Sequence, residues 1–360
     1  MKAAVLYEPN TPLVIEELDI NEPASGEVLV KMMASGVCHS DFHIVKGEWT
    51  QFELPILLGH EGAGIVEAVG PGVTSVKPGD HVILSWRASC GLCEMCQIGW
   101  VNLCQQPVLP SAKPRETKTG REINTLGGLG TFGAYSLVPE VAAVKIDEDI
   151  PFPQAALVGC GVTTGVGAAI NTAGVRPGTT TAVFGAGGVG LNCIQGCAIA
   201  GATTIIAVDL LDNKLELALE FGATHTVNAS REDPVARIIE LTGGVGTHYA
   251  FEAIGLVEAP FVQSIQCTRP RGLTVWVGHA PVNTPVTIDA KLLIQEKSVM
   301  MSMYGSARPR IEFPRLLALY KAGKLRLDEL ITRRFPLEEV NDAFGVLSKG
   351  EVARSVLSFE

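Results

Sequence analysis

The stretch TTAVFGAGGVG, residues 180–190, has the sequence of a strand that ends in a glycine turn and opens into a helix. Gly185, Gly187 and Gly190 form the pattern G-x-G-x-x-G, which lets the backbone approach a pyrophosphate at the N-terminus of the following helix. Asp209 ends the next apolar strand, where its carboxylate would accept both ribose hydroxyls of NAD. Strand, turn, helix, second strand and acid occur in order, which predicts a dinucleotide-binding unit.

The rest of the chain shows two different rhythms. Apolar strands and helical segments alternate from about Thr179, which predicts parallel strands with crossover helices. Residues 1–150 instead show short strands between Gly/Pro turns, typical of an antiparallel, barrel-like arrangement. Two amphipathic helices and the closing strand ARSVLSFE follow near the C-terminus. We therefore expect an α/β protein with a doubly wound parallel sheet, residues 162–303, inserted into a β-rich domain formed by residues 1–161 and 304–360.

The composition limits the partners of the protein. At 360 residues the chain exceeds what one hydrophobic core usually fills, so two domains are expected. A net charge of −10 opposes binding to a nucleic-acid backbone, which requires a basic face. No charged residue occurs between Arg176 and Asp209, a length that could cross a bilayer, but its many glycines favour strand, turn, helix and strand. We therefore expect neither nucleic acid nor a membrane as a partner.

The cysteines and the first residues indicate the compartment. Nine cysteines, an odd number clustered at metal-type spacings, fit a reducing compartment better than a disulfide framework. The start, MKAAVLYEPNTPLVIEE, lacks a long apolar core and a small-residue cleavage site, so no secretory signal is expected. These observations predict a cytoplasmic protein.

The stretch CGLCEMCQIGWVNLC, residues 90–104, carries the strongest metal signal. Its four cysteines follow one another at gaps of two, two and seven residues: Cys90, Cys93, Cys96 and Cys104. Four thiolates on a short loop can converge on a tetrahedral Zn²⁺ and leave no open position, which is the pattern of a structural site. An iron–sulfur centre is the competing interpretation, because ferredoxin-type sequences use similar two-residue gaps.

A second metal site is predicted from three separate motifs. Cys38 lies in SGVCHSDFH, His60 in GHEGAG and Cys160 in VGCGVTTG. Two thiolates and one imidazole leave the fourth position of a tetrahedral zinc free, as in catalytic sites. Taken singly, each cysteine is also compatible with a small core residue and the histidine with a turn residue. Spacing alone does not bring the three together.

The motifs together resemble the zinc-dependent medium-chain alcohol dehydrogenases. The similarity runs along essentially the whole chain, in the order VCHSDFH, GHEGAG, the four-cysteine lobe, GCGVTTG, FGAGGVG with VDL, and ARSVLSF. It implies a Rossmann-type domain inserted into a GroES-like catalytic domain. It also implies NAD, two zinc ions per subunit, one catalytic and one structural, and a homodimer or homotetramer.

The resemblance assigns further roles around the catalytic zinc. Glu61 would enter the coordination sphere as the bound water leaves, and Asp41 would orient His60, as metal-bound imidazoles usually require. Zinc would lower the pKa of an alcohol oxygen so that hydride passes to the nicotinamide. The proton would leave through Ser40, the cofactor ribose and then His43.

The resemblance also implies a set of cofactor contacts, namely His39, Thr164, Gly185, Gly187, Gly188, Val189, Gly190, Asp209, Lys214 and Arg354. Lys214 is equally compatible with a solvated charge on a helix. His39 stands where many relatives have an arginine on the pyrophosphate, and a neutral imidazole gives up that permanently charged, bidentate contact. We expect Cys193, Cys197 and Cys267 to pack in the core. His279 falls near the nicotinamide and substrate wall of the family without an assigned role.

Two tryptophans are expected to line the alcohol pocket. Trp49 and Trp86 align with positions that wall this pocket in the family, and Ser40 leaves a little room beside the metal. The glutathione-adduct branch of the family has an acidic residue at the position of Trp49 and a basic one just beyond the lobe, where this chain reads QQPVLP, residues 105–110, and neither charge is present here. These features favour primary alcohols or their aldehydes.

A second functional possibility is a nicotinoprotein, which holds NAD permanently. The segment SMYGSARPRIEFPRLLALY, residues 302–320, resembles that branch of the family. A non-enzymatic zinc or redox-sensing module is the third.

Overall fold

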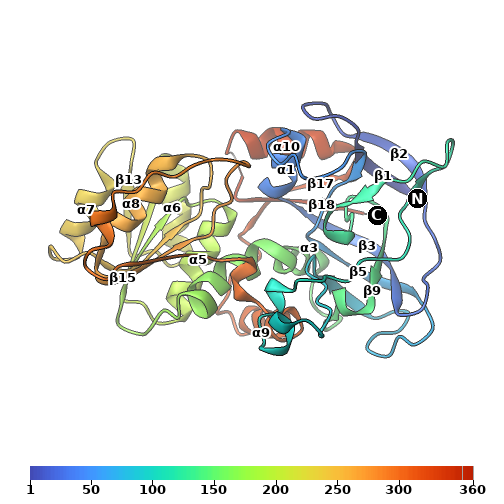
Figure 1. The fold of residues 1–360 in the computed structure, drawn as a ribbon, viewed down its shortest axis with the longest axis horizontal. Coiled ribbons are helices and arrows are strands. Elements are labelled where there is room, and N and C mark those ends of the chain that lie inside the picture. Colours follow the sequence, from blue (N-terminus) through green and yellow to red (C-terminus); the bar gives the residue numbers. More distant parts are fainter. Residues whose placement is uncertain (351, 360) are drawn as a thin grey trace. The chain divides into compact units, whose positions relative to one another are not determined.

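The computed structural model describes residues 1–350 and 352–359, and the chain divides into two compact units. The first unit contains Met1–Cys160, Arg308–Lys321 and Leu327–Glu360, and the second contains Gly161–Ala307 and Ala322–Arg326. Gly161, residues 304–307 and residues 322–326, which we expected in the first domain, lie in the second unit. Figure 1 shows the strands and helices of each unit along the chain.

The larger sheet of the first unit consists mainly of antiparallel neighbours, as predicted. Its strand order is β10-β6-β5-β3-β18-β17, and β9 also pairs with β3. The final two strands, β17 and β18, pair in parallel. The strands are β3 (Glu27–Val37), β5 (Gly62–Val69), β6 (His81–Leu84), β9 (Tyr135–Pro139), β10 (Ala143–Lys145), β17 (Ile331–Pro336) and β18 (Arg354–Ser358).

The register of this sheet brings distant parts of the sequence together. Ser355 at the start of β18 lies opposite Val37 at the end of β3. Ser35 of β3 lies opposite Gly62 at the start of β5. The end of β3 and the beginnings of β5 and β18 therefore lie side by side, and so do the residues that adjoin them.

A smaller sheet and several helices complete the first unit. The sheet has the order β7-β2-β1-β4-β8. Its strands are β1 (Lys2–Leu6), β2 (Val14–Asp19), β4 (Ile56–Leu57), β7 (Arg115–Glu116) and β8 (Asn124–Thr125). The apolar side chains of β1 and β4 share a hydrophobic core with two helices, α1 (His39–Val45) and α10 (Val340–Ser348). The helices are α2 (Glu94–Gln97), α3 (Phe152–Leu157), α9 (Pro309–Lys321), α1 (His39–Val45) and α10 (Val340–Ser348).

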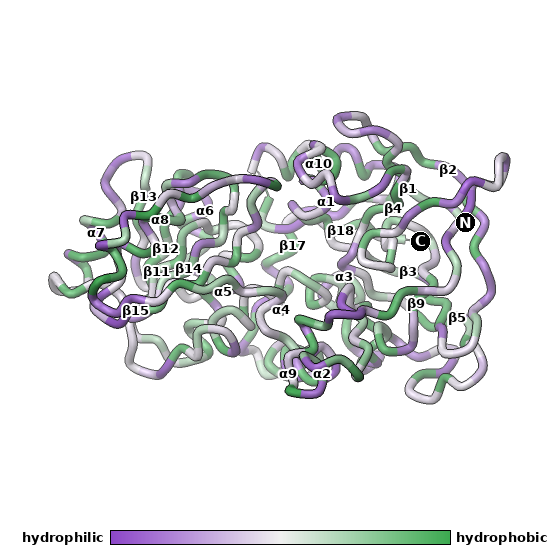
Figure 2. The backbone as a smooth tube through the Cα atoms, in the orientation of Figure 1, coloured by the Kyte–Doolittle hydropathy of each residue, from purple (hydrophilic) through white to green (hydrophobic). Residues whose placement is uncertain are grey.

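The second unit is built on a six-stranded sheet of parallel strands, as predicted. Its order is β13-β12-β11-β14-β15-β16. The strands are β11 (Thr180–Phe184), β12 (Thr204–Asp209), β13 (His225–Asn228), β14 (Thr247–Glu252), β15 (Thr268–Trp276) and β16 (Ser298–Met301). The helices are α4 (Thr163–Gly167), α5 (Gly188–Ile199), α6 (Asp212–Glu220), α7 (Pro234–Leu241) and α8 (Glu258–Gln266). Figure 2 shows the hydrophobic character of β11 and β12, whose middle residues are buried.

The glycine turn connects β11 to α5 as the sequence predicts. A side chain at Gly190 is excluded by close approach, because an added Cβ would lie 1.7 Å from the carbonyl oxygen of Gly185. Asp209, at the end of β12, accepts hydrogen bonds from the backbone N–H of Ala186 at 2.8 Å and of Leu210 at 2.7 Å. The carboxylate of Asp209 therefore lies beside the glycine turn and stabilises it through the hydrogen bond from Ala186.

Two apolar stretches raise the question of a membrane. The charge-free segment between Arg176 and Asp209 forms β11, α5 and β12, as predicted. One other helical run, Phe152–Thr172, is long and apolar enough to cross a membrane by length and composition. Within that run, 78% of the apolar window is buried inside the protein. The core helix of a soluble protein has the same property.

Glu252 fastens the loop that packs against the glycine turn. The backbone N–H of Ala253 donates to the carbonyl oxygen of Phe184 at 2.8 Å. Oε1 of Glu252 accepts hydrogen bonds from the N–H groups of Ile254 at 2.8 Å and Gly255 at 2.9 Å. The side chain is fully buried, and burial raises the pKa of its carboxyl from 4.5 to about 7, although these backbone donors oppose the shift.

Glu252 therefore makes stability depend on pH. Because its pKa is higher in the folded than in the unfolded protein, the stabilising contribution is complete below about pH 4.5 and is lost as pH rises through about 7. Glu252→Gln removes this ionisation. We expect the variant to gain stability relative to the unmodified protein as pH rises, by up to about 3 kcal/mol. Thermal unfolding at a series of pH values measures this gain, and a difference that does not change with pH would contradict the assignment.

Candidate active site and metal centres

Four side chains of the first unit converge on one buried point. The ligand atoms of Cys38, His60, Glu61 and Cys160 all lie within 4.8 Å of one another, and all four residues are buried. Cys38 follows β3 and caps α1, while His60 and Glu61 immediately precede β5. Cys160 lies in a single π-helical turn, Val158–Val162, a feature that is frequent at functional sites. The structure thus brings together the three ligands predicted from separate motifs.

One glycine beside these ligands, Gly36, leaves room for the carboxylate of Glu61. Gly36, on β3, faces Glu61, and an added Cβ at Gly36 would lie 2.1 Å from Oε2 of Glu61. The backbone N–H of Gly36 donates to the carbonyl oxygen of Glu61 at 2.8 Å. A larger residue at this position would therefore displace the carboxylate from the cluster.

Asp41 lies behind the imidazole of the cluster. Nδ1 of His60 lies 3.3 Å from Oδ1 and 3.2 Å from Oδ2 of this fully buried carboxylate. Oδ1 also accepts the N–H of Gly59 at 2.8 Å, which fixes its orientation. Burial alone would lower the pKa of His60, but Asp41 and Cys38 together raise it well above its ordinary value. With Nδ1 turned to Asp41, Nε2 is the nitrogen left to bind a metal.

Glu61 is paired with Arg354 in the same buried site. The guanidinium Nη2 of Arg354 donates to Oε2 of Glu61, and both side chains are almost fully inaccessible to solvent. Burial raises the pKa of Glu61 to about 7, while Arg354 opposes this shift. The structure thus places Arg354 against a carboxylate of the buried cluster, and its expected contact with the cofactor stays a prediction. The register of β18 against β3 explains this position.

The two thiols of the cluster shift each other's pKa in opposite directions. The hydrogen bond with Cys160 holds the pKa of Cys38 well below its ordinary value, against the effect of burial and with the help of His60. The same hydrogen bond, together with burial, raises the pKa of Cys160. A bound cation would remove this competition, because thiolates and a neutral imidazole are the forms that bind metal. The donor set fits zinc.

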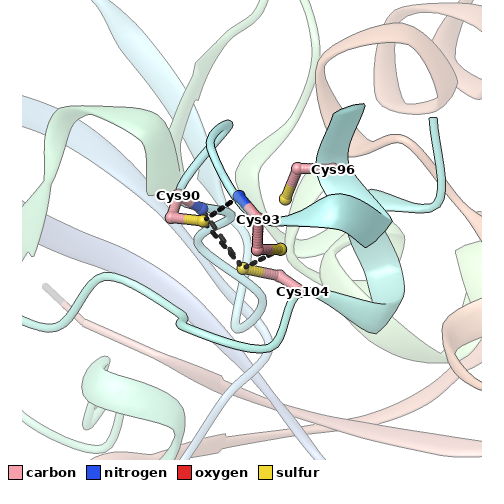
Figure 3. Close-up of side chains that lie close together, drawn as sticks. All are labelled: Cys90, Cys93, Cys96 and Cys104. Carbon is pink, nitrogen blue, oxygen red and sulfur yellow. Dashed lines mark hydrogen bonds between the residues drawn. The ribbon is translucent and has the colours of Figure 1, made fainter. Parts of the chain in front are cut away.

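The four-cysteine lobe forms a second cluster in the first unit. The sulfur atoms lie within 4.8 Å of one another (Figure 3). The Sγ atoms of Cys93 and Cys104 are 4.0 Å apart, and those of Cys104 and Cys90 are 3.5 Å apart. Four sulfurs at about 2.3 Å from one tetrahedral ion would lie about 3.8 Å from each other. The spacing therefore fits a single metal ion rather than a multi-atom cluster.

Backbone amides stabilise the thiolates of this lobe. The N–H groups of Leu92 and Cys93 donate to Sγ of Cys90 at 3.4 and 3.3 Å. The N–H of Gln105 donates to Sγ of Cys93 at 3.5 Å, and hydrogen bonds from the backbone lower the pKa of Cys93 to about 6. These donors favour the ionised sulfur of Cys90 and Cys93, which is the form that binds Zn²⁺, whereas burial raises the pKa of Cys96 to about 12.

Ser40 and His43 are both on α1, close to the cluster in sequence. The thiol of Cys38 lies 3.7 Å from Oγ of Ser40. His43 is 5% exposed, and its Nδ1 lies 2.5 Å from Oε2 of Glu48. Glu48 was not predicted as a partner of His43. The available signal was an acid placed just after the helix, five residues beyond the histidine.

The two tryptophans occupy different surroundings. The ring of Trp86 meets the ring of His60 edge to face, with centroids 6.5 Å apart, so it lies beside the metal cluster. The ring of Trp49 stacks on His43 at 4.8 Å and on Phe52 at 6.2 Å. Trp86 thus lies beside the ligand cluster, whereas Trp49 packs against His43 and Phe52.

The predicted cofactor residues are divided between the units. His39 is exposed at the start of α1, and Arg354 belongs to the first unit as well. In the second unit, Gly188, Val189 and Gly190 form the first turn of α5, Asp209 ends β12, and Lys214 lies partly buried on α6, while Thr164 lies on α4. Cys193, Cys197 and Cys267 are fully buried, as predicted. His279 lies just after β15 and is partly buried.

Comparison with known proteins identifies the class. Residues 24–148 match the alcohol dehydrogenase GroES-like domain, and residues 188–322 match the zinc-binding dehydrogenase domain. The chain therefore belongs to the zinc-dependent medium-chain alcohol dehydrogenase family. It is an oxidoreductase that oxidises alcohols and uses zinc and a nicotinamide cofactor.

Individual relatives cover nearly the whole chain. An NDMA-dependent alcohol dehydrogenase from Amycolatopsis methanolica is 41% identical over 365 residues, 99% of this chain and 98% of the relative. A solved alcohol dehydrogenase zinc-binding domain protein from Burkholderia ambifaria is 36% identical, with a TM-score of 0.94 over 100% of this chain and 98% of that chain. Benzyl alcohol dehydrogenase from Acinetobacter calcoaceticus is 33% identical, with a TM-score of 0.93 over 100% and 99%.

Proposed function

We propose that the protein oxidises primary alcohols reversibly to aldehydes with NAD, at a zinc ion held by Cys38, His60 and Cys160. The observation that carries this proposal is the buried cluster of two thiols, one imidazole and one carboxylate within 4.8 Å. Three protein ligands leave a position for substrate. The four-cysteine lobe would hold a second, structural zinc, because four thiolates leave no such position.

The residues around the cluster would divide the work of the reaction. Zinc, when bound, supplies Lewis-acid polarisation of the alcohol oxygen, and the nicotinamide supplies the hydride acceptor. Asp41 keeps the ring of His60 in place, and Arg354 keeps Glu61 beside the cluster, ready to exchange with the fourth ligand. Ser40 would accept the proton from the substrate and His43 would receive it at the end of the relay.

The substrate would be a short aliphatic or flat aromatic primary alcohol. Trp86 supports this assignment because its ring lies against that of His60. A large indole beside the metal reduces the space for a branched substituent, and such a misfit typically costs about 1–3 kcal/mol. Trp49 was expected to wall the same pocket, but its contacts with His43 and Phe52 favour a supporting role.

A second candidate is a nicotinoprotein that retains NAD through the catalytic cycle. The 41% identical relative from Amycolatopsis methanolica is named for its dependence on NDMA, an additional requirement besides the alcohol. A retained cofactor would explain such a requirement, because the reduced nicotinamide must then be reoxidised in place by a second substrate. For either candidate we propose a homodimer or homotetramer in the cytoplasm.

The metal assignment predicts two zinc ions per subunit. Cys38→Ala should remove one ion and the activity while leaving the protein folded. Cys93→Ala should lower the unfolding temperature, since structural zinc contributes directly to folding. Elemental analysis of the three purified proteins, with thermal unfolding, measures both effects. Iron and labile sulfide in the unmodified protein would instead indicate an iron–sulfur centre in the lobe.

The position of Asp209 predicts a preference for NAD over NADP. Its carboxylate lies at the glycine turn and would repel a 2′-phosphate, and the neighbouring Leu210 offers no cation. Asp209→Gly should narrow the preference by roughly ten-fold or more, equivalent to at least about 1.4 kcal/mol. Dissociation constants for both cofactors test this. Equal affinity of the unmodified protein for NAD and NADP would be incompatible with the role.

A single experiment separates the two functional candidates. The purified protein is denatured and the released NAD is quantified; the native protein is then given benzyl alcohol and excess NAD⁺. Little released NAD and bulk reduction are expected for an exchangeable cofactor. One NAD per subunit is expected for a nicotinoprotein. Its nicotinamide should be reduced by one equivalent only, and an added aldehyde acceptor should reoxidise it and allow alcohol oxidation to continue. If no nicotinamide is reduced in either format by the zinc-loaded protein, both candidates are wrong.

A further inference from the structure

His43 is enclosed by two residues that follow it closely in the sequence. Its Nδ1 lies 2.5 Å from Oε2 of Glu48, and its ring stacks on Trp49 with an interplanar angle of 13°. The histidine side chain is 6% exposed, whereas that of Glu48 is 37% exposed. One edge of the ring is therefore bound to a carboxylate and one face is covered by an indole.

The end of α1 is built to return Glu48 to this histidine. The N–H of Glu48 donates to the carbonyl oxygen of His43 at 2.9 Å, and the N–H of Gly47 donates to that of Ile44 at 3.0 Å. This pair of hydrogen bonds is the Schellman motif. Gly47 has φ of +68°, the left-handed conformation that the motif requires. The backbone turn thus fixes the position of the Glu48 main chain, independently of its side chain.

The contact decides which nitrogen of the imidazole carries the hydrogen. A carboxylate can only accept, so Nδ1 of His43 must be the donor. In the neutral ring the hydrogen then resides on Nδ1, and Nε2 keeps its lone pair. The stacked Trp49 ring restricts rotation of the imidazole about its side-chain bonds. Nε2 is consequently the atom available to accept a proton.

We propose that Glu48 is a positioning residue of the proton relay, which orients His43 and fixes its tautomer for proton acceptance at Nε2. The inference rests on the proposed function, in which His43 ends the relay. When Nε2 takes up the proton, Nδ1 retains its own hydrogen and the carboxylate of Glu48 faces the resulting imidazolium. The proton subsequently leaves from Nε2 to solvent, so that Glu48 is never itself protonated.

The test compares Glu48→Ala, Glu48→Gln and His43→Gln with the zinc-loaded protein. Reduction of the nicotinamide is followed in a single turnover after addition of a primary alcohol. We expect Glu48→Ala to slow this step about 10- to 100-fold with little change in the alcohol concentration needed for half saturation. Glu48→Gln, whose amide oxygen can still accept from Nδ1, should fall between Glu48→Ala and the unmodified protein. Added imidazole buffer should restore part of the lost rate in Glu48→Ala.

Glu53→Ala is the matched control, because Glu53 is an exposed acid only five residues further along. It should leave the rate unchanged. Zinc content and unfolding temperature of each variant identify any loss of fold, and Glu48→Gln, which preserves the shape of the side chain, decides the matter if Glu48→Ala unfolds.

The outcomes separate this inference from the proposed function. If His43→Gln slows the step and Glu48→Ala does not, Glu48 has no part in the relay and the inference is wrong. If Glu48→Ala is slow but imidazole restores nothing, the residue is merely structural, which also overturns it. If His43→Gln itself does not slow the step, the proposed relay is wrong, and the role inferred for Glu48 is wrong with it.

Discussion

The buried pairing of charges beside the metal cluster is the constraint on which the first unit depends. An ionised group in the interior costs several kcal/mol unless an opposite charge or hydrogen bonds compensate it. Glu61 is fully buried next to two thiols, and Arg354 supplies the compensating cation. Because Arg354 begins β18, the closing strand has to pair with β3 for the cluster to exist. A truncated Arg354 would leave Glu61 buried without its cation.

Much of this architecture could be predicted from local sequence. The strand, the glycine turn and the acid of the dinucleotide motif lie close together in the sequence, between residues 180 and 209. The four cysteines of the lobe also lie within a few residues, so their spacing alone indicates a metal site. The partner of Arg354 was not predictable, because it depends on the register between β18 and β3, which no local pattern fixes. Glu48 was missed for a different reason: its contact with His43 depends on the backbone turn at Gly47 rather than on helical periodicity.

The two candidate metal centres stabilise their thiolates by different physical means. In the lobe, backbone N–H groups donate to the sulfurs of Cys90 and Cys93, and these donors are fixed by the course of the chain. In the buried cluster, Cys38 depends on neighbouring side chains, namely Cys160 and His60. Backbone donors favour a rigid, closed site.

The contact of His43 with Glu48 is positioned by the backbone, as the sulfurs of the lobe are. Glu48 is placed by two backbone hydrogen bonds at the end of α1, and no ligand of the cluster takes part in them. His43 and Glu48 should therefore keep their geometry whether or not metal is bound. Asp41 and His60, in contrast, belong to a network that changes its charge when zinc arrives, because a neutral imidazole is the form that binds the ion. α1 thus carries two side chains that are held independently, because Asp41 belongs to the buried cluster and His43 is bound by Glu48.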